Sequence, residues 1–194
     1  MKLSEAVRGV SGTLAADGEF SCIAFATEQE QSQFLTFLEK EKFLPALDNS
    51  KISCVLTTSA LAEKIPPHIK GVFLCDRPKA ALFEIHNRLA RHPDYVGASA
   101  ATVVGEGCSI SPLAAIDREN VVIGDRVTIE PFVVIKGRVI IGNDVTIRSG
   151  AVIGCKGFSF SKDAQGQNVS VEDTARIIIE DHVEIFEQVA ISTG

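Results

Sequence analysis

Six-residue units repeat through the second half of this chain, and each opens on Ile or Val. A period of six matches neither the 3.6-residue period of a helix nor the two-residue alternation of a strand. It is typical of a short strand and a tight turn, repeated as parallel coils that pack against one another. Five consecutive intervals of six, from Ile123 to Ile153, argue against a β-sandwich with chance spacing. The first residues of the twelve units are Val104, Ile110, Ile116, Ile123, Ile129, Ile135, Ile141, Ile147, Ile153, Ile179, Ile185 and Ile191.

Three such units make one triangular coil of eighteen residues, so the repeats predict about four coils. Strands of neighbouring coils should lie about 4.8 Å apart, with the leading aliphatic residues pointing into the stack. Gly, Asp, Asn or Glu often follows the leading residue, as in Gly105, Gly124-Asp125, Gly142-Asn143 and Glu180-Asp181. Because Gly and Asn tolerate positive φ, we expect the corners of the coils at these positions.

The first half of the chain lacks this period and predicts a small α/β domain over residues 1–97. The β-helix domain should then cover residues 98–194, after a linker at His92-Pro93-Asp94-Tyr95. Residues 78–89 have helical spacing, and Pro78 suits a first turn. Strands are expected at 19–26, 34–38, 52–56 and 71–74, and short helices near 4–7 and 42–47.

Bulk composition excludes several classes of protein. The 194 residues carry a net charge of −6 with no basic run, which argues against nucleic acid as a partner. No apolar stretch is long enough to predict a transmembrane segment. Five widely spaced cysteines indicate neither a disulfide framework nor a zinc site, and favour a reducing, cytoplasmic location.

A long interruption breaks the repeats after Ile153, since the next regular unit starts at Ile179 rather than near position 159. We therefore predict an inserted loop over residues 154–178. Long loops on a rigid scaffold commonly carry binding residues, although a purely decorative loop is the alternative. Phe158 and Phe160, beside Gly157, are unusual in a solvated loop and could close over an apolar ligand.

Hexapeptide units that follow a small α/β domain resemble the LpxD family, the UDP-3-O-(3-hydroxyacyl)glucosamine N-acyltransferases of lipid A and lipopolysaccharide synthesis. The likeness covers nearly the whole chain and includes residues 34–43, 71–89 and the segment Ala151-Val152-Ile153-Gly154 leading into Gly157-Phe158. The resemblance, and nothing in the spacing, implies that the parallel β-helix is left-handed. It also implies a homotrimer that acts on a UDP-sugar with an acyl carrier protein or acyl-CoA donor. We expect neither a cofactor nor a metal.

In that family two aromatic residues of the first domain hold the uridine base, and the matching positions are Phe37 and Phe43. Both could equally be core residues of a small domain. The family has Asn three places after the first aromatic, where this chain has Lys40. An amide both donates and accepts hydrogen bonds, whereas Lys only donates, so Lys40 could instead meet a phosphate.

The family also uses a histidine on a later coil as the base that deprotonates the sugar amine. The candidates are His68 in a surface turn, His86 on the predicted helix, His92 in the linker and His182 at a turn. The resemblance places the catalytic histidine beyond position 194, so it has no counterpart here. We accordingly expect this chain to be part of a longer enzyme and to be inactive alone.

Three functions remain open from the sequence. The first is transfer of an acyl group from a thioester to the amino group of a UDP-linked glucosamine derivative. A related nucleotide-sugar N-acyltransferase for another surface polysaccharide fits nearly as well, and a non-catalytic hexapeptide-repeat binding or scaffold module is the third. A γ-carbonic anhydrase type of metal enzyme is disfavoured because the coils hold only His182, and such a site needs several histidines.

Overall fold

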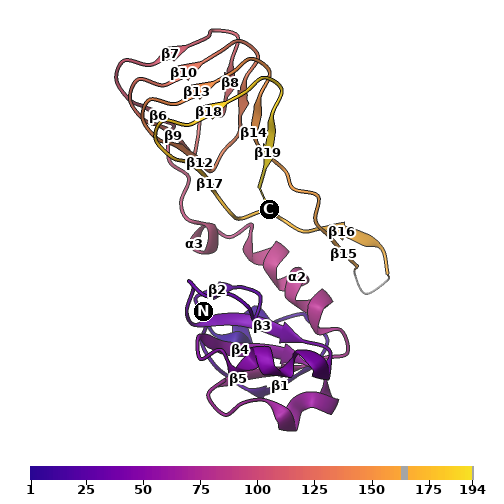
Figure 1. Cartoon of the computed structure of the whole chain (residues 1–194). Helices are drawn as coiled ribbons and strands as arrows, with labels where there is room; N and C mark the ends of the chain where they lie inside the picture. The colour runs from indigo at the N-terminus through magenta and orange to yellow at the C-terminus, as the bar shows by residue number, and fades with distance from the viewer. Residues whose placement is uncertain (163–165, 194) are drawn as a thin grey trace. The chain divides into compact units, whose positions relative to one another are not determined.

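The computed structural model describes residues 1–162 and 166–193 of the chain. Its contacts divide the chain into two compact units (Figure 1). The first unit contains Met1–Tyr95 together with Phe160–Glu172, and the second contains Val96–Ser159 together with Asp173–Gly194. The predicted division at residue 97 places the whole interrupting segment in the second domain. In the structure, residues 160–172 of that segment make their contacts with the first unit instead.

The first unit is built on a five-stranded sheet of order β1-β5-β4-β3-β2. Strands β2 to β5 are parallel, and β1 pairs antiparallel with β5. From β3 onward the strands alternate with helices along the chain, as is typical of an α/β domain. The elements are α1 (Leu3–Ala6), β1 (Thr13–Ala16), β2 (Cys22–Ile23), β3 (Phe34–Leu38), η1 (Glu41–Asp48), β4 (Ile52–Thr57), η2 (Ser59–Lys64), β5 (Gly71–Leu74), α2 (Pro78–Leu89) and α3 (Pro93–Val96).

Both faces of this sheet are covered by apolar side chains. Leu35 of β3 and Leu56 of β4 share one core with Ile85 of α2. Phe34 and Leu38, which alternate with Leu35 along β3, belong to the opposite core with Leu47 of η1. The two-sided burial explains why β3 and β4 have nearly continuous apolar sequences.

Most predicted elements of this unit are present. The structure confirms the helix at 78–89 and the strands at 34–38 and 71–74. The strand expected over 19–26 is confined to Cys22–Ile23, because only these residues pair with β3. The region expected to be a linker at 92–95 contains the short helix α3.

The interrupting segment contains an antiparallel hairpin, β15 (Phe160–Lys162) with β16 (Asn168–Ser170). Residues 163–165 of the predicted loop lie outside the described residues. Asn87 of α2 holds the hairpin's C-terminal end: its Nδ2 donates to the Ser170 carbonyl at 2.9 Å, and its Oδ1 accepts from the Glu172 amide at 2.8 Å. These bonds explain why 160–172 belongs to the first unit.

The second unit is a left-handed parallel β-helix, which confirms the predicted fold. Three four-stranded parallel sheets, β6-β9-β12-β17, β7-β10-β13-β18 and β8-β11-β14-β19, form its walls over four coils (Figure 1). The strands are β6 (Val103–Val104), β7 (Ser109–Ile110), β8 (Ala115–Ile116), β9 (Val121–Ile123), β10 (Thr128–Ile129), β11 (Val134–Ile135), β12 (Val139–Ile141), β13 (Thr146–Ile147), β14 (Val152–Cys155), β17 (Ile177–Ile179), β18 (Glu184–Ile185) and β19 (Ala190–Ser192).

The leading aliphatic residues stack in register, one coil upon the next. Ile135, for example, is opposite Ile116 on one side and Ile153 on the other. From Ile123 to Ile153 all six leading residues are no more than 2% exposed. Val104 on the first coil is 47% exposed, so inward packing is incomplete at this outer coil.

The predicted corner positions are wrong by one or two residues. Positive φ occurs three residues after the leading aliphatic, at Arg126, Phe132, Arg138, Asp144, His182 and Gln188 among others. The backbone amides of Arg126, Asp144 and His182 donate to carbonyls of the preceding coil at 2.8–2.9 Å, which stabilises an otherwise unfavourable conformation.

Gly105, Gly124 and Gly142 are required for a different reason, namely close approach between coils. A Cβ on Gly124 would lie 2.6 Å from the carbonyl oxygen of Gly142. None of these three glycines has a positive φ. Within the described residues, no helix has the length and apolar character needed to cross a membrane.

Candidate functional site

The predicted uridine-binding residues lie around the carboxyl end of β3. Phe37 is the penultimate residue of that strand, and Lys40 immediately precedes η1. Phe43 is in the first turn of η1, where its amide donates to the Lys40 carbonyl at 3.0 Å. In parallel sheets, ligands commonly bind beyond the carboxyl ends of the strands. The location therefore suits a ligand site.

The two aromatic rings differ in exposure and surroundings. Phe37 is half-buried and packs beside the core beneath α2, whereas Phe43 is 55% exposed. The Lys42 ammonium lies 4.8 Å from the centroid of the Phe43 ring. No ring contact joins Phe37 and Phe43 in the described part of the chain. The structure thus brings these residues onto adjoining elements without stacking them on each other.

Phe25 is an aromatic neighbour that the sequence did not identify. It follows β2, the strand beside β3, and remains 58% exposed. Its ring meets that of Phe37 edge-on, with the centroids 6.3 Å apart and the planes at 71°. In the sequence, Phe25 is simply an aromatic residue in the apolar segment Ile23-Ala24-Phe25-Ala26. Nothing in that segment indicates that its ring contacts Phe37.

Phe158 and Phe160 belong to different units and are described separately. Phe158 is 94% exposed in the second unit, next to Gly157, whose amide donates to Asp173 Oδ2 at 2.7 Å. Asp173 Oδ2 also accepts from the Thr193 hydroxyl at 3.0 Å, so this carboxylate fixes the start of the segment. Phe160 opens β15 in the first unit and is 51% exposed.

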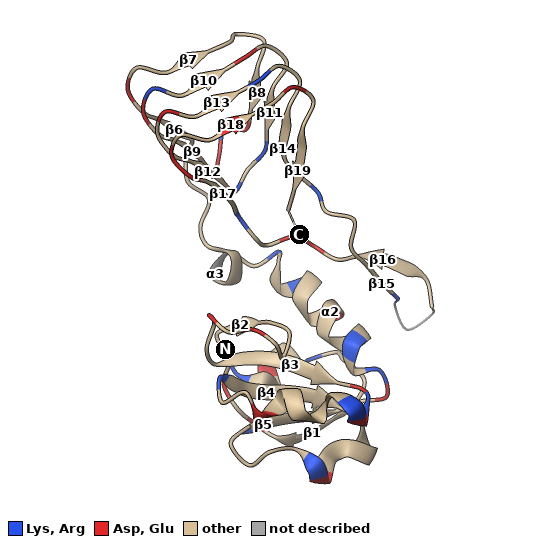
Figure 2. Cartoon of the chain, in the orientation of Figure 1, with Lys and Arg blue, Asp and Glu red and all other residues tan. Residues whose placement is uncertain are grey.

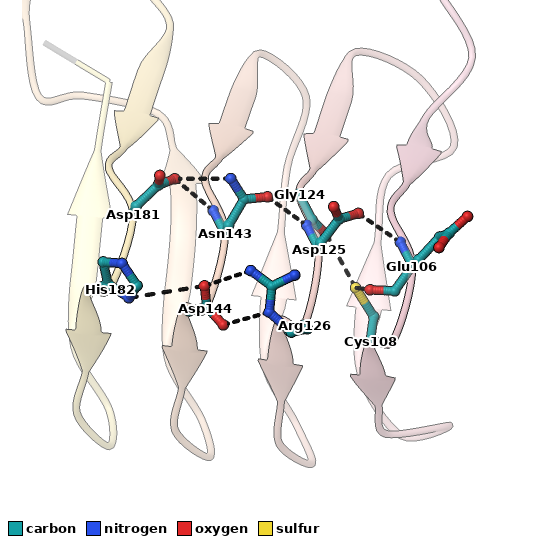
Figure 3. Close-up of polar contacts among 9 residues, drawn as sticks. All are labelled: Glu106, Cys108, Gly124, Asp125, Arg126, Asn143, Asp144, Asp181 and His182. Atoms are coloured by element: carbon teal, nitrogen blue, oxygen red, sulfur yellow. Dashed lines mark hydrogen bonds and ion pairs between the residues drawn. The ribbon is translucent and has the colours of Figure 1, made fainter.

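The histidines occupy structural or exposed positions. His86 Nε2 is 2.7 Å from the Glu172 carbonyl, and His68 Nε2 is 3.3 Å from that of Asn49. His182 is at a corner of the fourth coil, with its side chain 77% exposed and Nδ1 3.9 Å from Asp144 Oδ2 (Figure 3). Among the described residues, no group of His, Cys, Asp and Glu side chains could hold a metal ion.

The polar residues around His182 join one coil to the next (Figure 3). Asp181 Oδ1 accepts from the Asn143 amide at 2.7 Å, and Asn143 Oδ1 accepts from the Asp125 amide at 2.8 Å. Arg126 donates two hydrogen bonds of 2.7 Å to Asp144. These bonds to the Arg126 guanidinium lower the pKa of Asp144 below its usual range. The polar residues next to His182 therefore have a structural role, which is to join neighbouring coils.

A second charged cluster crosses three coils on another face. Arg148 donates to Glu130 at 2.9 Å and to Glu184 at 2.8 Å, and Ser149 donates through its amide and hydroxyl to Glu130. The hydroxyl of Ser149, followed by Arg148, lowers the pKa of Glu130. Both carboxylate oxygens of Glu130 and Oε1 of Glu184 are thus already engaged, which favours a structural role.

Comparison with known proteins supports both the repeat and the domain order. The family model described as bacterial transferase hexapeptide (six repeats) matches residues 120–155. UDP-3-O-acylglucosamine N-acyltransferase of Coxiella burnetii (strain RSA 493 / Nine Mile phase I) is 28% identical over 217 residues, covering 99% of this chain and 63% of the relative. The enzyme of that name from Helicobacter hepaticus is 32% identical over 91% of this chain and 58% of the relative. That from Helicobacter pylori is 25% identical over 98% of this chain and 62% of the relative.

The coils and the matched repeats define a hexapeptide-repeat protein. Within that class, the chain is a homologue of the UDP-3-O-acylglucosamine N-acyltransferases, the LpxD family, as its sequence predicts. The chain spans less than two thirds of the length of these curated relatives.

Proposed function

We propose that this chain functions as part of an N-acyltransferase of lipid A synthesis. The reaction moves a 3-hydroxyacyl group from an acyl carrier protein thioester to the amino group of a UDP-linked glucosamine derivative. The observation that carries the proposal is similarity to N-acyltransferases of this name along 99% of the chain, through both units. Five free cysteines favour a reducing compartment, so we place the protein in the cytoplasm.

The chemistry needs an amine nitrogen to attack the thioester carbonyl. A C–N bond forms, the C–S bond breaks, and a base takes the proton that the amine loses. His182 is poorly suited to this work because it is exposed at a corner and faces Asp144. We assign acceptor binding and a rigid wall to the described residues, and we assign no histidine among them as the base.

Acceptor recognition is proposed for the first unit. The uracil ring stacks on Phe37 and Phe43, and Phe25 supports Phe37 through the edge-on contact. Lys40, exposed between them in sequence, meets a phosphate of the same ligand. In the second unit, we propose that the exposed Phe158 contacts the acyl chain. Phe160, on the hairpin of the first unit, is proposed separately as an apolar contact for substrate.

Replacing Phe37 by alanine should weaken UDP binding by about tenfold or more, because loss of base stacking costs about 1–3 kcal/mol. Isothermal titration calorimetry of the full chain with UDP measures the effect. Phe132→Ala removes an exposed ring from the β-helix, 65% accessible, and should leave the UDP affinity unchanged. Absence of UDP binding by the unmodified chain, or equal affinities for both variants, would contradict the proposed site.

Lys40 favours a second candidate function. Where the family has an amide, an ammonium cannot accept a hydrogen bond from the base. A nucleotide-sugar N-acyltransferase for another surface polysaccharide fits this residue, with either acyl carrier protein or acyl-CoA as donor. A hexapeptide-repeat module that binds UDP-sugars without turnover is the remaining alternative. Parallel binding and turnover assays with UDP-glucosamine derivatives distinguish such a module from an enzyme, because the module binds the derivatives but does not acylate them.

We also propose a homotrimer, supported by one apolar face of the β-helix. Val103, Val122, Ile140 and Ile178 are opposite one another on strands β6, β9, β12 and β17. Val103, Val122 and Ile178 are 57%, 45% and 60% exposed. A continuous apolar row of this kind marks an interaction surface, and burial against further copies of the chain would remove it from water.

Light scattering should therefore give three times the chain mass of 20.8 kDa for the unmodified protein. Val122→Lys should reduce the mass to that of one chain, because an unpaired charge in an apolar interface is strongly unfavourable. Thr128→Lys, on the adjoining sheet, is the control and should leave the assembly intact. A monomeric unmodified protein would refute the trimer.

A further inference from the structure

A cleft of about 740 Å³ lies in the first unit, away from the aromatic residues assigned to the base. Its sides are one face of α2, the segment Gly9–Ser11 and the hairpin of the interrupting segment. Cys75 and Ala81, both buried, form its floor. The volume is in the range of small-molecule sites. Phe37, Lys40 and Phe43 do not line it.

The hairpin side of the cleft is fixed to α2. Both polar atoms of the Asn87 side chain bond to the hairpin's C-terminal backbone, and His86 Nε2 donates to the Glu172 carbonyl at 2.7 Å. At the other end, the Arg77 guanidinium donates to the Lys162 carbonyl at 3.4 Å. A wall held at both ends gives the cleft a defined shape, which a binding site needs.

Cations predominate around this cleft although the whole chain carries −6. Basic residues recur along α2 (Figure 2). The charged side chains lining the cleft are the cationic Arg77, Arg88, Arg91 and Lys162 and the acidic Asp76 and Glu84. The local balance is opposite in sign to that of the protein and attracts anions.

The helix dipole explains only part of this arrangement. Arg88 lies in the last turn of α2, where cations are favourable, and donates to the carbonyls of Arg8 and Ala6. Arg77 is the N-cap of the same helix, where a cation opposes the dipole, and the first turn contains no acidic residue. Arg77 is held there in part by its hydrogen bond to the Lys162 carbonyl, and its charge adds to the positive potential of the cleft.

Arg91 supplies a guanidinium group near the C-terminal end of α2, opposite Arg77. It lies two residues beyond Leu89, the last residue of α2, and lines the same cleft as Arg88. In the part of the chain that the structure describes, its guanidinium has no side-chain or backbone acceptor. A planar guanidinium binds phosphate oxygens in pairs, whereas Ala80, Phe83 and Val169 offer apolar contact to the rest of a ligand.

We infer that this cleft is a second binding site, for a small phosphate-bearing molecule, separate from the proposed uridine site. Arg91 and Lys162 bind the phosphate oxygens, and Arg88, held by its bonds to the α1 region, adds positive charge beside them. The ligand's apolar portion lies along Ala80, Phe83 and Val169. Binding here requires neither acyl transfer nor uridine recognition.

Titration calorimetry of the full chain with inorganic pyrophosphate tests the site. We expect saturable binding, weakened about tenfold by Arg91→Ala and likewise by Lys162→Ala, since hydrogen bonds to charged groups are worth about 1.5–3 kcal/mol. Lys79→Ala removes an exposed cation from the same helix outside the cleft and should change the affinity less than about twofold. All three variants alter exposed side chains, and circular dichroism verifies that they fold.

Three results would overturn the inference. One is the absence of saturable binding of pyrophosphate at low ionic strength. Another is an equal loss in Lys79→Ala, which would indicate a diffuse attraction to the basic helix. The last is a loss of pyrophosphate binding in Phe37→Ala with Arg91→Ala unaffected, which would assign the anion to the uridine site. Failure of UDP binding alone leaves this cleft's test unchanged.

Discussion

Replacing Ile135 by alanine should lower the free energy of unfolding by about 2–5 kcal/mol, the largest effect expected of a single substitution in this chain. Ile135 is fully buried in the middle of the β-helix. It packs between Ile116 of the coil below and Ile153 of the coil above. Truncation leaves a cavity that neither neighbour can fill, because the backbone of β11 is hydrogen-bonded on both sides.

Urea unfolding followed by circular dichroism, at one fixed protein concentration, measures this loss. Val134→Ala is the matched control, since Val134 is next to Ile135 on the same strand and faces the other side. It should cost less than about 1 kcal/mol. Equal losses in the two variants would show that inward packing of the leading aliphatic residues does not dominate the stability of the coils.

The rows of buried aliphatics could be predicted because a six-residue period projects directly onto the three walls. Residues eighteen apart, such as Ile129 and Ile147, necessarily become neighbours once the coil closes. The hand of the helix could not be derived in this way and required resemblance to a family. Helix α2 was similarly accessible, since Pro78 and the spacing of its apolar face are local signals.

The positions of the corners and the contacts of the hairpin could not be predicted from local sequence. Arg126, Phe132 and Arg138 adopt positive φ although such residues rarely do, because bonds between coils fix the backbone. The hairpin joins the first unit through Asn87, more than eighty residues away in the chain. Such long-range hydrogen bonds leave no periodic signal.

The candidate site was likewise only partly predictable. Phe37 and Phe43 were identified by resemblance, and their positions near one strand end agree with a ligand site without testing it. Phe25 was missed because its contact with Phe37 depends on the parallel pairing of β2 with β3. The cleft beside α2 was missed because its walls come from segments far apart in the sequence: residues 9–11, α2 and the hairpin.

Replacing Gly124 by alanine should destabilise the β-helix by about 1–3 kcal/mol through overpacking. The added Cβ would lie 2.6 Å from the Gly142 carbonyl oxygen, 2.7 Å from its carbon and 2.8 Å from Asn143 Oδ1. Two of these atoms are backbone of the next coil, so the coils themselves must separate. Separation would also strain the hydrogen bond from the Asp125 amide to Asn143 Oδ1.

Gly137→Ala provides the matched control within the same β-helix. Its nearest neighbour would be the Glu119 carbonyl oxygen at 3.4 Å, an ordinary contact, and Gly137 has no positive φ. Alanine there should leave stability unchanged or raise it by about 0.4–1 kcal/mol, because it restricts the unfolded chain. Thermal and urea unfolding of both variants measure the difference. If Gly124→Ala proved as stable as Gly137→Ala, close approach of the coils would not be the reason for glycine at this position.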